Sequence, residues 1–180
     1  AALETAAELE LDHTFVFEDP SRGWKISKFV ANCKNLDGHD KAQLKTAMEM
    51  ARKLHECGAT VDRSFSFYEE AALFEKKILE REPICASDWS AMKAQAARLN
   101  DLLAADGGQP VLCHNDFFGL NFLIGDDGFI NLIDWEYAGM SDYANDFGTF
   151  CVCEQLSEDE MKLALTYYFG RTPTEAEWRH

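Results

Sequence analysis

The stretch that decides the fold is VLCHNDFFGLNFLIGDDGFINLIDW, residues 111–135. Its apolar runs at 111–113, 121–124 and 129–133 are short and rich in β-branched and aromatic residues, so they predict small buried strands. The Gly-Asp-Asp-Gly sequence at 125–128 predicts a tight turn between the last two strands, because Asp-Gly tolerates the positive φ that such turns require. The polar residues of the stretch therefore lie at strand ends and turns.

The polar side chains of this stretch follow a specific order. His114 and Asp116 flank one residue, Asn121 follows Asp116 by five positions, and Asp134 comes after the predicted hairpin. This is the order of parts in a kinase catalytic loop and its metal-binding aspartate. Phosphoryl transfer needs a carboxylate that accepts or orients the substrate hydroxyl proton, and oxygen ligands that hold Mg²⁺ against the phosphates.

Asp116 suits the first of these roles, and Asn121 with Asp134 suits the second. The alternative is that these residues only stabilise turns, which is the commonest use of Asp and Asn. The ordered set, with strands between its members, favours the catalytic interpretation.

The bulk composition indicates an ordinary globular chain. Its 180 residues are 47% hydrophobic, enough for one good core or two small lobes. No apolar run approaches the roughly 18 residues of a membrane helix and no leader pattern is present, so we expect a cytoplasmic location and no membrane partner. The net charge of −15 disfavours a nucleic-acid partner and would attract a cationic small substrate.

The six cysteines are scattered without the paired spacing of zinc sites, and we interpret them as reduced core thiols. Cys151 and Cys153 suggest a metal site only weakly, because residues two apart on a helix point to different faces.

The two ends of the sequence predict a piece of a longer protein. Residues 1–9 predict a helix that has no N-terminal capping residue. The capping box from Thr174 to Glu177 predicts the start of another helix, and the sequence ends at His180 before this helix completes one full turn. Residues 14–18 and 24–30 predict a hairpin, followed by a polar linker over 32–39.

Most of the remaining sequence predicts helices. Apolar residues recur at helical spacing between residues 40 and 57, with Gly58 at the stop: Leu44, Ala47, Met48, Ala51 and Leu54. Further helices are predicted over 67–79, 87–105 and 143–156, and another starts at the capping box of Ser157 and Glu160. We expect the aromatic residues of 67–79 and 87–105 to lie in the core.

Three motifs together resemble the choline/ethanolamine kinase branch of the aminoglycoside-phosphotransferase-like kinases, and bacterial choline kinases most strongly. They are His114-Asn115-Asp116 with Asn121, the sequence IDWEYAG at 133–139, and Asp146-Phe147-Gly148. The resemblance runs from residue 14 to about residue 153. It implies an α+β, protein-kinase-like fold. Residues 32–180 would be the C-terminal lobe, which is mainly helical, contains small β-hairpins and would be truncated at its end. Residues 1–31 would be the remnant of the N-terminal lobe: a helix end, the last hairpin and the hinge.

The resemblance also implies the site residues and the cofactors, ATP and Mg²⁺. Asp116 would be the catalytic base, while Asn121 and Asp134 would complete the catalytic set and bind Mg²⁺. His114 and Asp146 would give structural support to the loop. The nucleotide-binding residues would be Lys28, Phe29 and Val30 of the hinge, together with Ile133. The Gly-rich loop and ATP-binding Lys of the family do not occur in this sequence.

The substrate follows less directly. Aromatic faces and a nearby carboxylate hold a quaternary ammonium best, and Trp135, Glu136, Tyr137 and Tyr143 offer both near Asp134. The alternative is that Trp135 and Tyr137 only pack the loop.

We therefore expect a small-molecule kinase that transfers the ATP γ-phosphate to the hydroxyl of choline or ethanolamine, and little activity from this piece alone. An aminoglycoside or another small molecule is the nearest alternative substrate. A non-catalytic nucleotide- or Mg²⁺-binding interaction module is the alternative from another class. The sequence does not indicate an oligomeric state.

Overall fold

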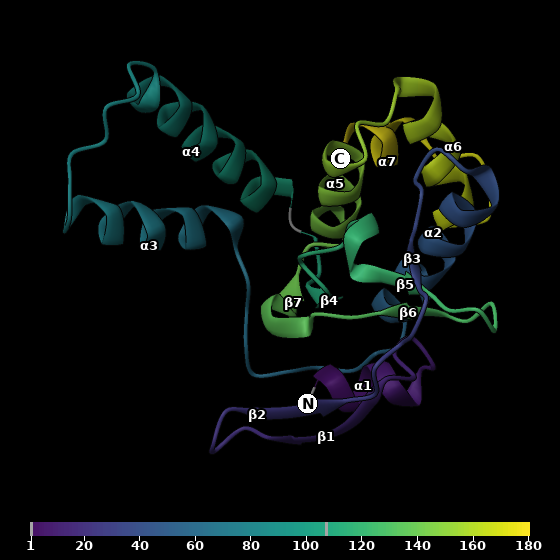
Figure 1. Ribbon diagram of the computed structural model, residues 1–180. Helices are drawn as coiled ribbons and strands as arrows, with labels where there is room; N and C mark the ends of the chain where they lie inside the picture. The colour runs from purple at the N-terminus through teal and green to yellow at the C-terminus, as the bar shows by residue number, and fades with distance from the viewer. Residues whose placement is uncertain (1, 107) are drawn as a thin grey trace.

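The computed structural model describes residues 2–106 and 108–180, which form short strands surrounded by helices (Figure 1). The helices are α1 (Ala2–Glu8), α2 (Lys41–His55), α3 (Phe67–Leu79), α4 (Trp89–Asp106), α5 (Ala144–Cys153), α6 (Glu158–Phe169) and α7 (Glu175–Arg179). The strands are β1 (Phe15–Asp19), β2 (Trp24–Ser27), β3 (Lys34–Asn35), β4 (Val111–Cys113), β5 (Phe122–Ile124), β6 (Ile130–Leu132) and β7 (Gly139–Ser141). The predicted α+β class is confirmed.

The strands form three small antiparallel sheets, β1–β2, β3–β5–β6 and β4–β7. Both predicted hairpins are present, and Gly128 takes a φ of +80° in the turn between β5 and β6. The predicted linker over 32–39 is wrong in one respect, because it contains β3. Lys34 pairs with Ile124 of β5, a strand far along the chain. Local composition could not reveal this pairing, since the partner supplies the hydrogen bonds.

Helix α2 forms the centre of the core and lies beside α6 and β4. Its side-chain cap is Asp40, which accepts hydrogen bonds from the backbone N–H groups of Ala42 and Gln43. All of its predicted core residues are buried: Leu44, Ala47, Met48, Ala51 and Leu54. Each fully buried large apolar side chain stabilises the fold by roughly 1.5–3 kcal/mol.

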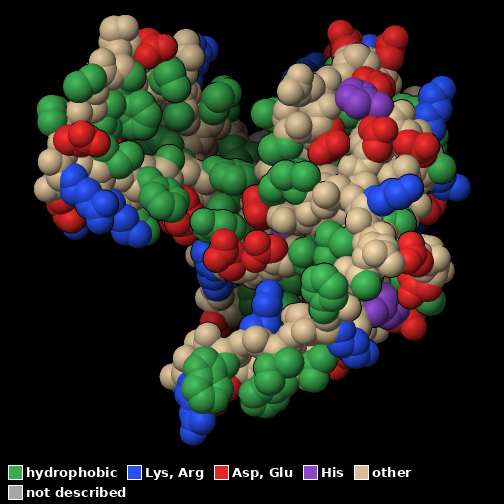
Figure 2. Space-filling view, viewed as in Figure 1, with side chains coloured by type: hydrophobic (Ala, Val, Ile, Leu, Met, Phe, Trp, Pro, Cys, Tyr) green, Lys and Arg blue, Asp and Glu red, His purple; other side chains and the backbone are tan. Residues whose placement is uncertain are grey.

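The helix pair α3–α4 extends away from the rest of the chain (Figure 1). No residue of α3 is buried; Phe67 is 46% and Phe74 is 48% exposed. Hydrophobic side chains gather over this pair in the space-filling view (Figure 2). The prediction that the aromatic residues of α3 lie in the core is therefore wrong for this structure, because only α4 packs closely on α3. Within the described residues, no helix combines the length and the apolar character needed to cross a membrane.

Candidate active site

The loop after β4 brings Asp116 and Asn121 into contact. The side-chain Nδ2 of Asn121 donates to the backbone oxygen of Asp116 at 2.8 Å and to its Oδ2 at 2.8 Å. Asn121 is 8% exposed, at the start of β5. Since Nδ2 makes both bonds, the carbonyl oxygen Oδ1 of Asn121 stays available as an oxygen ligand.

Asp134 follows β6 and lies next to Asn121. The N–H of Ile133 donates to the backbone oxygen of Asn121 at 2.9 Å, which fixes the two segments side by side. Asp134 has a φ of +67°, in the left-handed region, and its side chain is exposed. A carboxylate and an amide oxygen are hard ligands of the kind that Mg²⁺ prefers, so the donor set fits this ion.

A buried carboxylate on α5 holds the other end of the loop. Asp146 accepts hydrogen bonds from the N–H groups of His114 at 2.9 Å and Asn115 at 2.6 Å. Its Oδ2 also lies 2.9 Å from Nε2 of His55, whose Nδ1 is 2.8 Å from the hydroxyl of Tyr168. Asn115 takes a φ of +63°, so these bonds stabilise a backbone conformation that few residues adopt.

His114 is fully buried beneath the loop. Its Nε2 lies 2.9 Å from the backbone oxygen of Ile133, and the N–H of Asp116 donates to its Nδ1 at 3.3 Å. Burial lowers the pKa of His114, although the nearby Asp146 carboxylate acts in the opposite direction. The ring is therefore neutral near pH 7 and carries its proton on Nε2. The His114 ring supports the loop that carries Asp116 and packs edge-on against Trp135.

A second carboxylate, on the residue that follows α5, was not predicted. Oε1 of Glu154 accepts from the N–H of Gly119 at 2.9 Å, and Oε2 accepts from the N–H of Gly38 at 3.1 Å. A Cβ on Gly119 would lie 2.6 Å from the backbone oxygen of Leu36. Glu154 thus ties the catalytic loop to the segment around β3. No local pattern marks it, because its partners are distant in sequence.

His55 was also missed, although a signal existed. It follows Ala51 by four positions and Met48 by seven, so it belongs to the apolar face of α2. A polar residue on such a face needs a buried partner, and Asp146 provides it.

A cleft of about 380 Å³ lies between β2 and the end of β6. It brings the four predicted nucleotide-binding residues together with Asp134; these are Lys28, Phe29, Val30 and Ile133. Leu123 also lines the cleft and adds an apolar surface. Phe29 is 92% exposed at its edge.

The four predicted substrate residues do not share one environment. Trp135 is 5% exposed and its Nε1 donates to the backbone oxygen of Leu132 at 2.8 Å, which favours packing over contact with a substrate. Glu136 is exposed, and Tyr137 is half-buried with its ring 5.9 Å from the guanidinium carbon of Arg63. Tyr143 belongs instead to an aromatic cluster with Tyr168, Phe169 and His180.

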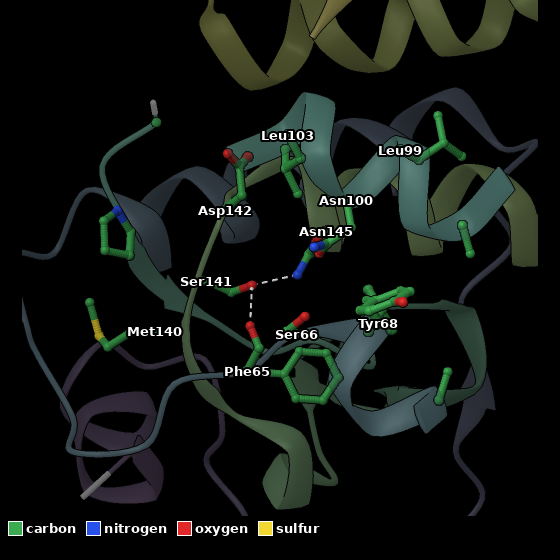
Figure 3. Close-up of a pocket in the computed structure, with 15 residues that line it drawn as sticks. Phe65, Ser66, Tyr68, Leu99, Asn100, Leu103, Met140, Ser141, Asp142 and Asn145 are labelled. Carbon is green, nitrogen blue, oxygen red and sulfur yellow. Dashed lines mark hydrogen bonds between the residues drawn. The ribbon is translucent and has the colours of Figure 1, made fainter. Parts of the chain in front are cut away.

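A larger cavity of about 620 Å³ lies between the α3–α4 pair and β7 (Figure 3). Ser141 donates to the backbone oxygen of Phe65 at 3.2 Å in its wall, and Asn145 donates to Ser141. None of the predicted site residues lines this cavity, so it is separate from the loop of Asp116.

The cysteines are all free thiols, as predicted, but only Cys113 and Cys151 are buried; the core placement is wrong for the exposed Cys85 and Cys153. Cys151 is buried and Cys153 exposed, as expected for residues on different faces of a helix. Cys113 lies close to His55 and Asp146, within 4.8 Å between potential ligand atoms. Burial raises the pKa of the Cys113 thiol, and both ring nitrogens of His55 already have partners in Tyr168 and Asp146, so we describe this cluster as a hydrogen-bonded part of the core.

Comparison with known proteins supports the kinase-like fold. A sequence profile of the phosphotransferase enzyme family matches residues 26–179. No curated protein matches the chain in sequence.

Solved structures superpose on most of the chain. Choline kinase LicA from Streptococcus pneumoniae does so with a TM-score of 0.82 at 23% identity, over 97% of this chain and 60% of that one. A choline/ethanolamine kinase family protein from Mesorhizobium loti superposes with a TM-score of 0.81 at 24% identity, over 98% of this chain and 62% of that one. ADP-bound aminoglycoside phosphotransferase APH(2'')-Ib superposes with a TM-score of 0.59 at 19% identity, over 98% of this chain and 68% of that one. The predicted kinase-like fold is confirmed, and the chain spans about three-fifths of the first two structures.

Proposed function

Because this chain belongs to the phosphotransferase enzyme family, we propose that it forms the catalytic part of a kinase that transfers the ATP γ-phosphate to choline or ethanolamine. The observation that carries this proposal is the contact between Asp116 and Asn121 beside Asp134, at the edge of the hinge cleft. This arrangement supports the proposal, because a carboxylate, two candidate oxygen ligands and a cleft of about 380 Å³ lie in one region. We propose residues 1–31 and 32–180 as the two parts that meet there, and a cytoplasmic location.

The residues would divide the chemistry as follows. Asp116 would accept the proton of the substrate hydroxyl as it attacks the γ-phosphorus, while Asn121 holds the carboxylate in position. Oδ1 of Asn121 and the carboxylate of Asp134 would hold Mg²⁺, which when bound neutralises charge on the phosphates. The backbone at Lys28 to Val30 would bind the base edge, and Ile133 its face.

The choice of an amino alcohol rests on charge and on the named relatives. Glu136 is exposed and precedes the half-buried Tyr137 in the sequence, and a carboxylate with an aromatic ring is a combination that suits a quaternary or primary ammonium. The net charge of −15 favours a cationic substrate. LicA is a choline kinase, and its TM-score of 0.82 exceeds the 0.59 of APH(2'')-Ib. Trp135 would support the loop from within the core.

A panel of hydroxyl acceptors tests this proposal. Choline, ethanolamine and an aminoglycoside are assayed for ATP-dependent phosphorylation with the longest available protein that contains this chain. We expect turnover with an amino alcohol and its loss in Asp116→Asn. Turnover with the aminoglycoside alone would change the substrate class.

Binding measurements test the non-catalytic alternative. Calorimetry with Mg-ATP compares the native chain with Asp134→Ala, which should bind the nucleotide more weakly because it loses a metal ligand. Unchanged binding and unchanged turnover in this variant would show that the metal assignment is wrong.

A further inference from the structure

A buried carboxylate outside the predicted site residues lines the hinge cleft. Asp12 is 3% exposed, and Oδ1 accepts from the N–H of Thr14 at 2.8 Å and from its hydroxyl at 2.6 Å. Oδ2 has no hydrogen-bond partner in residues 2–106 and 108–180. In the same part of the chain, every fully enclosed side-chain N or O atom has a partner. Oδ2 is therefore open to the cleft that Asp12 lines together with Val30 and Ile133.

The backbone on both sides of Asp12 is fixed. Leu11 accepts a hydrogen bond from the N–H of Leu132 at 2.8 Å, and the N–H of His13 donates to Oδ1 of Asn131 at 3.0 Å. Thr14 accepts from the N–H of Lys28, the first hinge residue, at 2.7 Å. The carboxylate thus has a rigid position between the hinge and β6.

The cleft has an apolar part that suits a flat base, and Lys25, Ser27 and Lys28 line it as well. Leu123 and Ile133 come from β5 and the end of β6, and Val30 comes from the hinge. A planar base between such side chains would place its polar edge near the hinge backbone. Once a base fills the cleft and excludes water from it, this acceptor oxygen is costly to bury unless the base donates to it.

Purine bases differ at the atom that would face such an oxygen. Adenine carries an amino donor at C6, whereas guanine and hypoxanthine carry a carbonyl acceptor there. We propose that Asp12 determines nucleobase specificity, with Oδ2 accepting a hydrogen bond from the 6-amino group of adenine. This inference rests on the proposed function, since it requires a nucleotide in the hinge cleft. It adds the residue that would select 6-aminopurine nucleoside triphosphates over 6-oxopurine ones.

Asp12→Asn tests this role with little change in shape. The Asn carbonyl oxygen keeps the two bonds from Thr14, so its NH₂ group takes the place of Oδ2 and faces the cleft as a donor. We expect the native chain to bind Mg-ATP at least about tenfold more tightly than Mg-ITP, because ATP can donate one charge-assisted hydrogen bond to Asp12 and ITP cannot. Asp12→Asn should reduce this ratio about tenfold or invert it. Affinities are measured by calorimetry or by titration of ¹⁵N-labelled protein.

Matched controls separate the possible outcomes. Asp62→Asn removes an exposed charge elsewhere and should leave the ATP/ITP ratio unchanged. If Asp12→Asn does not fold, purine riboside triphosphate, which lacks the 6-amino group, should bind the native chain about tenfold more weakly than ATP. An unchanged ATP/ITP ratio in folded Asp12→Asn, or equal binding of ATP and the purine analogue, would overturn the role of Asp12 while leaving the kinase proposal intact. Failure of the native chain to bind either nucleotide would overturn both.

Discussion

The side chain of Asn121 binds Asp116 twice, once at the backbone oxygen and once at Oδ2, both at 2.8 Å. The first bond closes the loop between β4 and β5. The second orients the carboxylate before any substrate arrives. Because one amide nitrogen makes both bonds, the position of the proposed base and the position of a proposed metal ligand are set by the same residue.

Removing this amide should cost activity more than stability. In Asn121→Ala, Asp116 loses its orienting donor and Mg²⁺ loses an oxygen ligand, so we expect kcat to fall by about 100-fold or more. Gln95→Ala is a suitable control, since it removes an exposed side-chain amide on α4. Phosphoryl transfer by the full protein is the measurement, and a decrease below threefold would contradict the proposed role.

Asp146 should contribute mainly to stability. Asp146→Asn weakens the bonds to the loop backbone and to His55, and we expect a loss of about 1.5–3 kcal/mol in the free energy of unfolding. Urea denaturation measures this loss. A double-mutant cycle with His55→Gln should give a coupling of roughly 0.5–3 kcal/mol, because the two side chains are in contact. Additive effects would show that the His55 contact carries no energy.

Two glycines should respond oppositely to the same substitution. A Cβ on Gly119 would lie 2.6 Å from the backbone oxygen of Leu36, so Gly119→Ala should destabilise the fold by about 1–3 kcal/mol. Gly148 is within α5 and a Cβ there meets no atom within 4 Å. Gly148→Ala should therefore stabilise the fold by about 0.5–1 kcal/mol. Thermal unfolding of both variants checks the pair, and equal signs would contradict the packing around Glu154.

The buried ring of His114 should make the fold sensitive to acid. Burial lowers its pKa below the ordinary 6.5. Between these two values the unfolded chain binds a proton that the folded chain does not. The contribution of His114 is therefore complete above about pH 6.5 and declines as the pH falls below it.

Unfolding measured between about pH 7 and pH 5 tests this prediction, and His114→Gln should lose less stability over that range than the native chain. His39 is the matched control, because its hydrogen bond to Glu160 raises its pKa and its contribution is lost as the pH rises instead. His39→Gln should therefore not reduce the acid sensitivity. An identical pH profile for His114→Gln and the native chain would show that another group is responsible.

The candidate site could be predicted where its signals are local. The spacing of Asp116, Asn121 and Asp134 lies within one stretch, and the structure brings all three to one edge of the β5–β6 hairpin. Glu154 and Asp12 could not be predicted, because their roles depend on partners that the fold brings from elsewhere. Gly38 lies more than a hundred positions from Glu154, and the cleft that Asp12 lines draws Leu123 from β5 and Ile133 from just after β6.

The sequence by itself determined the helices and turns. Apolar spacing defined α2, capping boxes defined α6 and α7, and Asp-Gly defined the β5–β6 turn, since each is a contact between residues a few positions apart. Tertiary structure alone decided that the two-residue β3 pairs with β5 and that Phe74 is exposed on α3. It also decided that Asp12 lines the hinge cleft. Burial and sheet pairing depend on which residues from distant parts of the sequence pack against a segment, and no local pattern specifies those residues.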